Sequence, residues 1–200
     1  MIPVQTKTYW LIVFISILLI PGFAMVFSVA DGNLLILIGL SLALIITSFL
    51  IWLYINNFGW RQKFFRVGGW LTPIPDLRGR WIGELDRKDT VGAHRFVIEI
   101  QQTLANIQVH TFSSRGQSSS FTAQIISDPQ EKHFQLVYTW IGKGGTLQGE
   151  QHEIGFFYGT TILDFVESPT KLLKGEYYTN RAPVQTKGKI EVVWLSTSPS

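Results

Sequence analysis

The 200-residue sequence contains no cysteine, and that absence removes several kinds of chemistry at once. Without thiols the chain has no disulfide framework, no thiolate nucleophile and no zinc–thiolate site. Charged residues are also few, at 16% of the chain. From Asp76 onward acidic and basic residues are equal in number, so the C-terminal part is neutral. A neutral domain lacks the basic face of a protein that binds DNA or RNA polymers, and we expect no such partner.

Sequence motifs for catalysis and metal binding are missing as well. The stretch from Gly142 to Thr146 resembles a phosphate-binding loop but fails the P-loop spacing, and a hairpin turn explains it better. His152 and Glu153 begin a zinc-protease pattern, but Phe156 occupies the position of the second histidine. We therefore expect no enzyme, no catalytic residue, no metal site and no cofactor.

Two long apolar runs stand at the front of the chain. Residues 9–30 and 34–55 contain no charged residue and are separated only by Asp31-Gly32-Asn33. An α-helix rises about 1.5 Å per residue, so about 20 apolar residues cross the hydrocarbon layer of a bilayer. The sequence therefore predicts two transmembrane helices, a hairpin within residues 1–57.

Positive charges flank this hairpin on one side. Lys7 precedes the first run, and Arg61, Lys63 and Arg66 follow the second, whereas the connecting loop carries only Asp31. Because positive residues prefer the cytoplasmic side, we expect a multi-pass membrane protein with both termini in the cytoplasm. Cleavage by signal peptidase after the small residues before the loop is the alternative, and the second span would still leave the C-terminal domain inside.

Residues 58–75 form a predicted juxtamembrane linker. Tryptophan and phenylalanine alternate there with arginine and lysine, a composition that suits the headgroup layer of anionic lipids. Gly68-Gly69, Pro73 and Pro75 then end any helix. The lipid bilayer is therefore an expected partner of the chain.

Residues 76–200 alternate between apolar and polar side chains, which is the period of a β-strand. In Arg80–Asp86, for example, Trp81, Gly83 and Leu85 share one face. Gly159 and the glycines of 142–145 are interpreted as turns. The pattern predicts an all-β domain, a small antiparallel up-and-down β-barrel of about eight strands, with a sandwich as the alternative. The strand candidates are Arg80–Asp86, Arg95–Gln101, Ala105–Phe112, Ser119–Ser127, Lys132–Trp140, Gly149–Tyr158, Thr161–Glu167, Leu172–Tyr178 and Lys189–Leu195.

Two clusters in this domain combine aromatic rings with polar donors. One surrounds Trp81, and the other contains Tyr177, Thr179, Asn180 and Arg181. Tyr177 and Thr179 share strand parity, so we expect them to face inward together. An arginine can bind a phosphate through two N–H groups. A Gly-x-Trp strand with a late arginine is also the lipocalin-type arrangement, in which the arginine closes the barrel over the tryptophan.

The chain as a whole resembles a known family. It is similar to the two-transmembrane β-barrel effectors of bacterial antiphage (CBASS) immunity, of the CD-NTase-associated protein 15 type. The similarity lies in the hairpin, the basic aromatic linker, the opening motif Arg78-Gly79-Arg80-Trp81-x-Gly83-x-Leu85 and the closing motif Gly175-x-Tyr177-x-Thr179-Asn180-Arg181. The resemblance implies that a partner nucleotidyltransferase, a CD-NTase, makes a cyclic dinucleotide that the barrel binds. Bound effectors then oligomerise and disrupt the bacterial inner membrane, which kills or arrests the cell.

A cyclic dinucleotide carries two phosphates and two bases, so its site needs cations, aromatic faces and base-edge donors. The matching stretch makes Tyr177, Thr179, Asn180 and Arg181 the expected ligand-binding residues, together with Trp81. A second cation is expected from Arg80, Arg95 or Lys189.

Two other functions remain open at the level of sequence. A membrane-tethered lipocalin-like barrel that binds a lipid or other apolar ligand would need an interior lined by apolar residues alone. An adaptor that recruits a partner protein is the third hypothesis.

Overall fold

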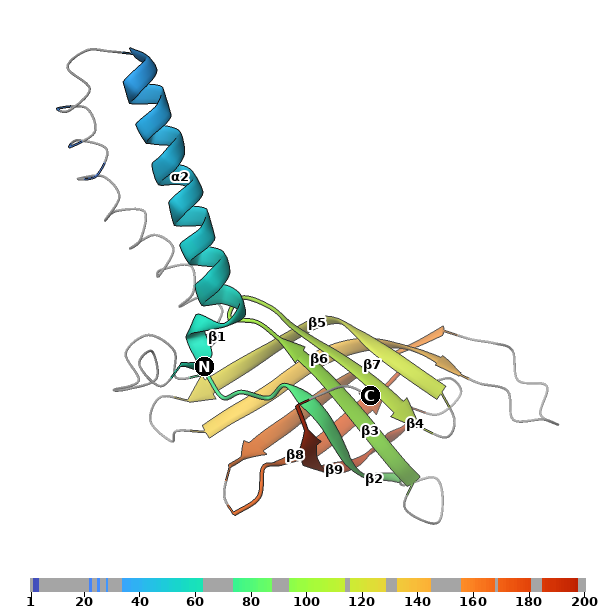
Figure 1. Cartoon of the computed structure of the whole chain (residues 1–200). Helices are drawn as coiled ribbons and strands as arrows, with labels where there is room; N and C mark the ends of the chain where they lie inside the picture. The colour runs from blue at the N-terminus through green and yellow to red at the C-terminus, as the bar shows by residue number, and fades with distance from the viewer. Residues whose placement is uncertain are drawn as a thin grey trace. The chain divides into compact units, whose positions relative to one another are not determined.

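A computed structural model of the chain describes residues 2–3, 22, 25, 28, 34–62, 74–87, 94–113, 116–128, 133–144, 156–167, 169–180 and 185–197 (Figure 1). Its contacts separate two compact units. The barrel unit comprises Met1–Val4, Ile74–Gln102 and Asn106–Ser200, and the helical unit comprises Gln5–Pro73 and Thr103–Ala105.

The helical unit is dominated by α2, Leu34–Asn57, which agrees with the predicted span 34–55 to within two residues at its end. Within it, Ile38–Asn57 has a mean hydropathy of 2.3 and no buried residue, so length and composition allow it to cross a bilayer. The other predicted span, 9–30, lies outside the described residues except for Gly22, Met25 and Ser28, which are helical.

The end of α2 is capped by groups from the same unit. The 3₁₀ turn Gly59–Arg61 follows, and the Arg61 guanidinium donates to the Asn57 carbonyl oxygen at 2.8 Å. A cation at a helix C-terminus satisfies an otherwise open carbonyl and opposes the helix dipole. The backbone N–H of Leu104 donates to the carbonyl of Asn56 at 2.9 Å.

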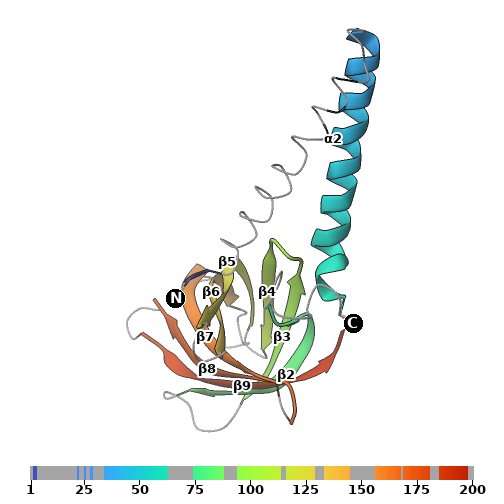
Figure 2. The ribbon, with the colours of Figure 1, turned by 90° about the vertical axis from the view of Figure 1, so that its left-hand side faces the viewer.

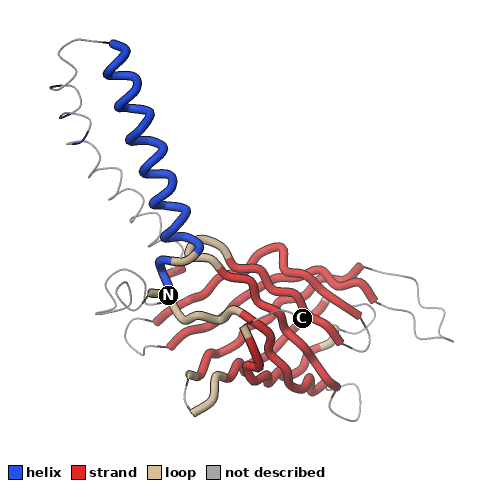
Figure 3. Tube along the Cα trace, in the orientation of Figure 1, coloured by secondary structure: helices blue, strands red, loops and turns tan. Residues whose placement is uncertain are grey.

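The described strands of the barrel unit form a closed ring in sequence order. Every neighbouring pair is antiparallel, β2 pairs with β9, and β5 pairs with both β4 and β6. Figure 2 shows these strands curving around an enclosed interior, and Figure 3 shows that strands make up most of this unit. The predicted up-and-down barrel is therefore confirmed, and the sandwich alternative is wrong. The strands are β2 (Gly79–Arg87), β3 (His94–Gln102), β4 (Ile107–Ser113), β5 (Gly116–Asp128), β6 (His133–Gly144), β7 (Phe156–Val166), β8 (Leu172–Thr179) and β9 (Lys187–Ser196), and a short β1 (Ile2–Pro3) adds to β5.

Alternate residues of each strand fill the interior, as the period of two predicts. On β3, Phe96, Ile98 and Ile100 are buried between more exposed neighbours. On β8, Tyr177 and Thr179 are each 6% exposed, so the prediction that they face inward together is confirmed.

Two glycines expected in turns lie inside strands instead. Gly159 lies within β7 and pairs with Trp140 of β6, so residues 156–158 of the predicted strand 149–158 are continuous with the predicted strand 161–167, while residues 149–155 lie outside the described residues. Gly142 lies within β6 and pairs with Phe157. A Cβ at Gly159 would collide with the Trp140 ring. These glycines therefore allow close packing between the neighbouring strands β6 and β7 rather than chain reversal.

The chain enters the barrel through Ile74–Arg78, here called the entry segment, and this end of the interior is densely packed. The amide of Gln102 holds the segment from inside, because it accepts from the Leu77 N–H at 2.8 Å and donates to the Pro75 carbonyl at 3.1 Å. The Trp81 indole donates to the Leu77 carbonyl at 2.8 Å. Leu77 and Trp81 are both fully buried, so the entry segment plugs this end of the barrel.

We expect Trp81→Ala to destabilise the barrel by about 3–5 kcal/mol, because it leaves a large cavity and an unpaired buried carbonyl. Chemical denaturation of the full chain in detergent micelles, followed by near-UV circular dichroism, measures the change. Phe121→Ala on β5 is the matched control, since that ring is 61% exposed and its loss should cost little. Equal effects of the two substitutions would contradict the assignment of Trp81 to the core.

An ion pair within the entry segment makes its stability depend on pH. The Arg78 guanidinium contacts the Asp76 carboxylate through two bonds, of 2.8 and 2.7 Å. Burial raises the pKa of Asp76, but the hydrogen bonds and charge of Arg78 outweigh it, and the net shift is downward. Because the folded-state pKa lies below that of the unfolded chain, the pair stabilises the fold above about pH 4 and loses this contribution in more acid solution.

We therefore expect Asp76→Asn to lower the melting temperature at neutral pH and to lessen its fall between about pH 5 and pH 2. Thermal melts of the full chain across that range test this. Glu84→Gln, a substitution at an exposed outward carboxylate of β2, should leave the acid dependence almost unchanged. Identical pH profiles for Asp76→Asn and the native chain would refute the role of the pair.

Candidate functional site

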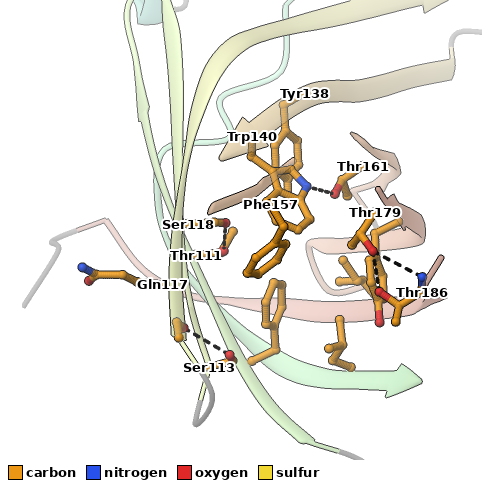
Figure 4. Close-up of a pocket in the computed structure, with 15 residues that line it drawn as sticks. Thr111, Ser113, Gln117, Ser118, Tyr138, Trp140, Phe157, Thr161, Thr179 and Thr186 are labelled. Atoms are coloured by element: carbon orange, nitrogen blue, oxygen red, sulfur yellow. Dashed lines mark hydrogen bonds between the residues drawn. The ribbon is translucent and has the colours of Figure 1, made fainter. Parts of the chain in front are cut away.

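The barrel contains a cavity of about 100 Å³ at the end opposite the entry segment (Figure 4). It opens to solvent, and each strand from β2 to β9 contributes to its wall or borders it. Aromatic rings and hydroxyl groups dominate the lining. The described lining residues are Leu85, Phe96, Thr111, Ser113, Gly116, Gln117, Ser118, Tyr138, Trp140, Phe157, Thr161, Tyr177, Thr179, Thr186 and Ile190.

Most of the aromatic rings of the wall lie opposite a glycine on the next strand. The pairs are Phe96 with Gly83, Trp140 with Gly159, Phe157 with Gly142, and Tyr177 with Gly188. The remaining ring, Tyr138, lies opposite Ala123.

The glycines let two of these rings lie against the wall. A Cβ at Gly142 would stand 2.7 Å from the Phe157 ring, and one at Gly188 would stand 2.6 Å from the Tyr177 ring. Both distances are well below van der Waals contact, so a side chain at either position would displace its ring or the backbone. The rings themselves occupy the space above these glycines, so they lie close against the wall.

Thr161 positions two rings of the wall. Its hydroxyl oxygen accepts from the Trp140 indole N–H at 2.9 Å, and the pair is buried. Burial raises the pKa of Tyr138, an effect that a hydrogen bond with Thr161 only partly offsets, so the phenol stays neutral. Phe157 packs edge-on against Trp140, with ring centroids 5.6 Å apart. These contacts hold the rings in fixed orientations before any ligand arrives.

Two hydroxyl pairs face the cavity from different walls. Thr111 of β4 is hydrogen-bonded to Ser118 of β5. Thr179 of β8 is bonded to Thr186, just before β9, at 2.6 Å. In an eight-stranded ring, β4 and β5 lie across the lumen from β8 and β9, and Figure 4 shows the two pairs on opposite sides of Trp140 and Phe157. A hydroxyl can both donate and accept a hydrogen bond, so each pair can bond to a donor or to an acceptor on a ligand.

Among the described lining residues none is charged. Arg80 faces outward and lies 3.7 Å from the Glu99 carboxylate. Arg95 and Lys189 are exposed on the outer face, paired in register with Glu84 and Glu176. None of these three basic residues therefore supplies the second cation that was expected inside. In the part of the chain that the structure describes, no group of His, Asp or Glu is arranged to hold a metal ion.

The structure brings together only some of the residues predicted to bind a ligand. Tyr177 and Thr179 line the cavity, whereas Trp81 packs at the entry end and is not part of the lining. Asn180 faces outward, and its side-chain oxygen accepts from the Tyr158 N–H at 2.7 Å. Arg181 lies outside the described residues.

Several wall residues were missed in the sequence, above all Trp140, Phe157 and Thr161. The sequence does indicate this wall, because Gly142 and Gly159 stand within segments of alternating apolar and polar residues, but these glycines are interpreted above as turns. A glycine flanked by inward aromatic residues two positions away, as in Trp140-Ile141-Gly142, indicates a ring stacked across strands rather than a chain reversal.

Comparison with known proteins identifies similar chains. Residues 72–193 match the family model described as "Cap15, cyclic dinucleotide receptor domain". CD-NTase-associated protein 15 of Escherichia albertii is 26% identical over 123 residues, which cover 61% of this chain and 62% of that protein. The match thus spans about three fifths of the length of this curated relative.

We expect Thr161→Val to destabilise the barrel by about 1–3 kcal/mol, because it leaves the buried indole N–H of Trp140 without an acceptor. It should also change the tryptophan fluorescence as that ring relaxes. Thermal melts and emission spectra of the full chain measure both effects. Thr160→Val is the matched control, since Thr160 is the outward neighbour on the same strand. A control that behaves like Thr161→Val would show that the indole bond has no special role.

Proposed function

This chain belongs to the Cap15 cyclic dinucleotide receptor family, and we propose on that premise that its barrel binds a cyclic dinucleotide and acts as an effector of CBASS immunity. The observation that carries the proposal is the mixed lining of the cavity, in which aromatic faces stand beside neutral hydroxyl pairs. Nucleobases stack on aromatic faces and form hydrogen bonds along their edges, so both features suit them.

The same lining argues against the lipocalin-like alternative. A barrel for lipid or another apolar ligand would need an interior lined by apolar residues alone. The hydroxyls of each wall are bonded to each other as a pair, and an apolar ligand would use neither pair, whereas the polar edges of a base can bond to both. An adaptor that only recruits a partner protein would not need a cavity in the barrel.

We assign Arg181 to the phosphates of the ligand. It follows Asn180 directly in the chain, and a guanidinium can bind a phosphate through two N–H groups. Tyr177 and Thr179 bind from the wall in this proposal. Asn180 contributes by holding the end of β8 against Tyr158. Trp81 supports the fold and is the weakest of the predicted contacts.

The membrane part of the proposal rests on α2 and the resemblance of the whole chain. We propose that the protein is a multi-pass protein of the bacterial inner membrane with both termini in the cytoplasm. A partner CD-NTase supplies the ligand there. Bound copies oligomerise and disrupt the membrane, which kills or arrests the infected cell. Ligand shifts this equilibrium only if it binds the assembled state more tightly than the resting state.

Titration calorimetry of the full chain in detergent micelles, against a panel of cyclic di- and trinucleotides, tests the ligand. We expect saturable binding of one cyclic dinucleotide. Arg181→Ala should weaken it by about ten- to a hundredfold, because a charge-assisted bond contributes about 1.5–3 kcal/mol, while the melting temperature stays the same. Arg95→Ala, an exposed outward arginine, is the control and should bind normally.

A well-folded chain that binds no member of the panel would refute the proposed ligand. Loss of stability in Arg181→Ala, with no effect on nucleotide binding, would instead favour an arginine that closes a lipocalin-like barrel. Crosslinking in vesicles with and without the bound nucleotide then tests assembly separately.

A further inference from the structure

We propose that the cavity receives a single nucleobase of the ligand and that the phosphates and the second base remain outside it. This inference rests on the proposed binding of a cyclic dinucleotide and specifies how that ligand is recognised. In this proposal the barrel recognises one base of each ligand molecule.

The size of the cavity is the first argument. Its volume is about 100 Å³. A cavity of about 150 Å³ takes up one benzene ring, and pockets that enclose a whole drug-sized ligand measure about 300–1,000 Å³. The cavity is smaller than either and opens to solvent, so it can hold no more than one planar base, with part of that base at its mouth, and two nucleotides do not fit.

The polarity of the wall is the second argument. The described lining residues offer hydroxyls and aromatic rings but no cation, and the Gln117 side chain points away from the cavity (Figure 4). Burying a phosphate anion without a cation costs far more free energy than burying a neutral base whose edge is hydrogen-bonded. A base therefore enters this wall more readily than a phosphate does.

The arrangement of the wall is the third argument. Trp140 and Phe157 are held edge to face between the two hydroxyl pairs, Thr111–Ser118 and Thr179–Thr186. A planar base inserted beside these rings meets an aromatic face and brings its two edges toward opposite walls (Figure 4). The hydroxyl pairs can then bond to the donors and acceptors of the base.

A consequence follows for ligands that carry two different bases. If the cavity binds only one base, a cyclic dinucleotide that carries the preferred base twice has two equivalent ways to bind. A mixed cyclic dinucleotide that carries the preferred base once has a single way to bind. Their affinities should then differ only by the statistical factor of about two. A site that reads both bases would instead separate them by tenfold or more.

Titration calorimetry of the full chain in detergent micelles tests this with cyclic dinucleotides made from every pair of the four RNA bases. We expect one base to confer binding, and all ligands containing it to bind within about threefold of one another. A mixed ligand that binds more than tenfold better or worse than the preferred homodimer overturns the single-base proposal but leaves cyclic dinucleotide binding intact. No binding by any of them overturns both.

Variants of the wall provide a second measurement. Thr111→Val should weaken every binding ligand by about the same factor, on the order of tenfold, because it removes one hydroxyl pair. Gly142→Ala should do so as well, because its Cβ pushes the Phe157 ring toward the cavity. Thr122→Val is the control, since the Thr122–Thr139 hydroxyl pair lies on the outer face of β5 and β6.

Competition with free nucleosides gives a third test. The nucleoside that carries the preferred base, whether adenosine, guanosine, cytidine or uridine, should displace the bound cyclic dinucleotide at high concentration, and the other three nucleosides should not. A native melting temperature in Thr111→Val together with unchanged affinity for every ligand would also contradict the proposal. If Thr111→Val does not fold, Ser118→Ala removes the partner of the same hydroxyl pair and decides the matter.

Discussion

The closed ring of eight antiparallel strands is the constraint on which the rest of the structure depends. Closure gives each strand from β2 to β9 a neighbour on both sides, with β4 and β5 joined over only four residue pairs, and it gives the barrel an interior of limited width. Side chains must fill that interior or leave it open. At the entry end, Trp81 and Leu77 fill it completely. At the other end a cavity remains beside the aromatic rings, so one lumen provides both a core and a site.

The glycine–aromatic pairs show how the wall of the cavity is packed. A glycine inside a strand weakens it, since it adds backbone entropy to the unfolded chain and packs no side chain. Gly142, Gly159 and Gly188 are each covered by a ring on the next strand, as Gly142 is covered by Phe157, and this contact recovers part of the lost burial. Thr161 then orients the Trp140 ring through a buried hydrogen bond. The wall is therefore preorganised by residues that do not themselves need to touch a ligand.

Neutral and charged groups are separated in this barrel. The described wall of the cavity holds hydroxyls and rings, whereas Arg80, Arg95 and Lys189 lie on the outer face beside carboxylates. In the proposed complex an anionic ligand places one base inside and its phosphates outside the neutral wall, and Arg181, which follows Asn180 in the chain, is the residue proposed to bind them. Selection of the base would then depend on the cavity wall, and recognition of the phosphate charge would depend on Arg181.

The sequence by itself determined the apolar span, the all-β domain and the inward parity of Tyr177 and Thr179, because each depends only on residues close together in the chain. Period-two alternation identifies the face of a strand, and composition identifies a bilayer span. The tertiary structure alone decided that Gly159 lies in a strand, that Asn180 bonds to Tyr158 on the outside, and that Trp81 is not part of the cavity lining. It alone also placed Thr111–Ser118 across from Thr179–Thr186. These outcomes depend on register and ring closure between segments distant in sequence, and no local pattern encodes the partner that a strand will meet.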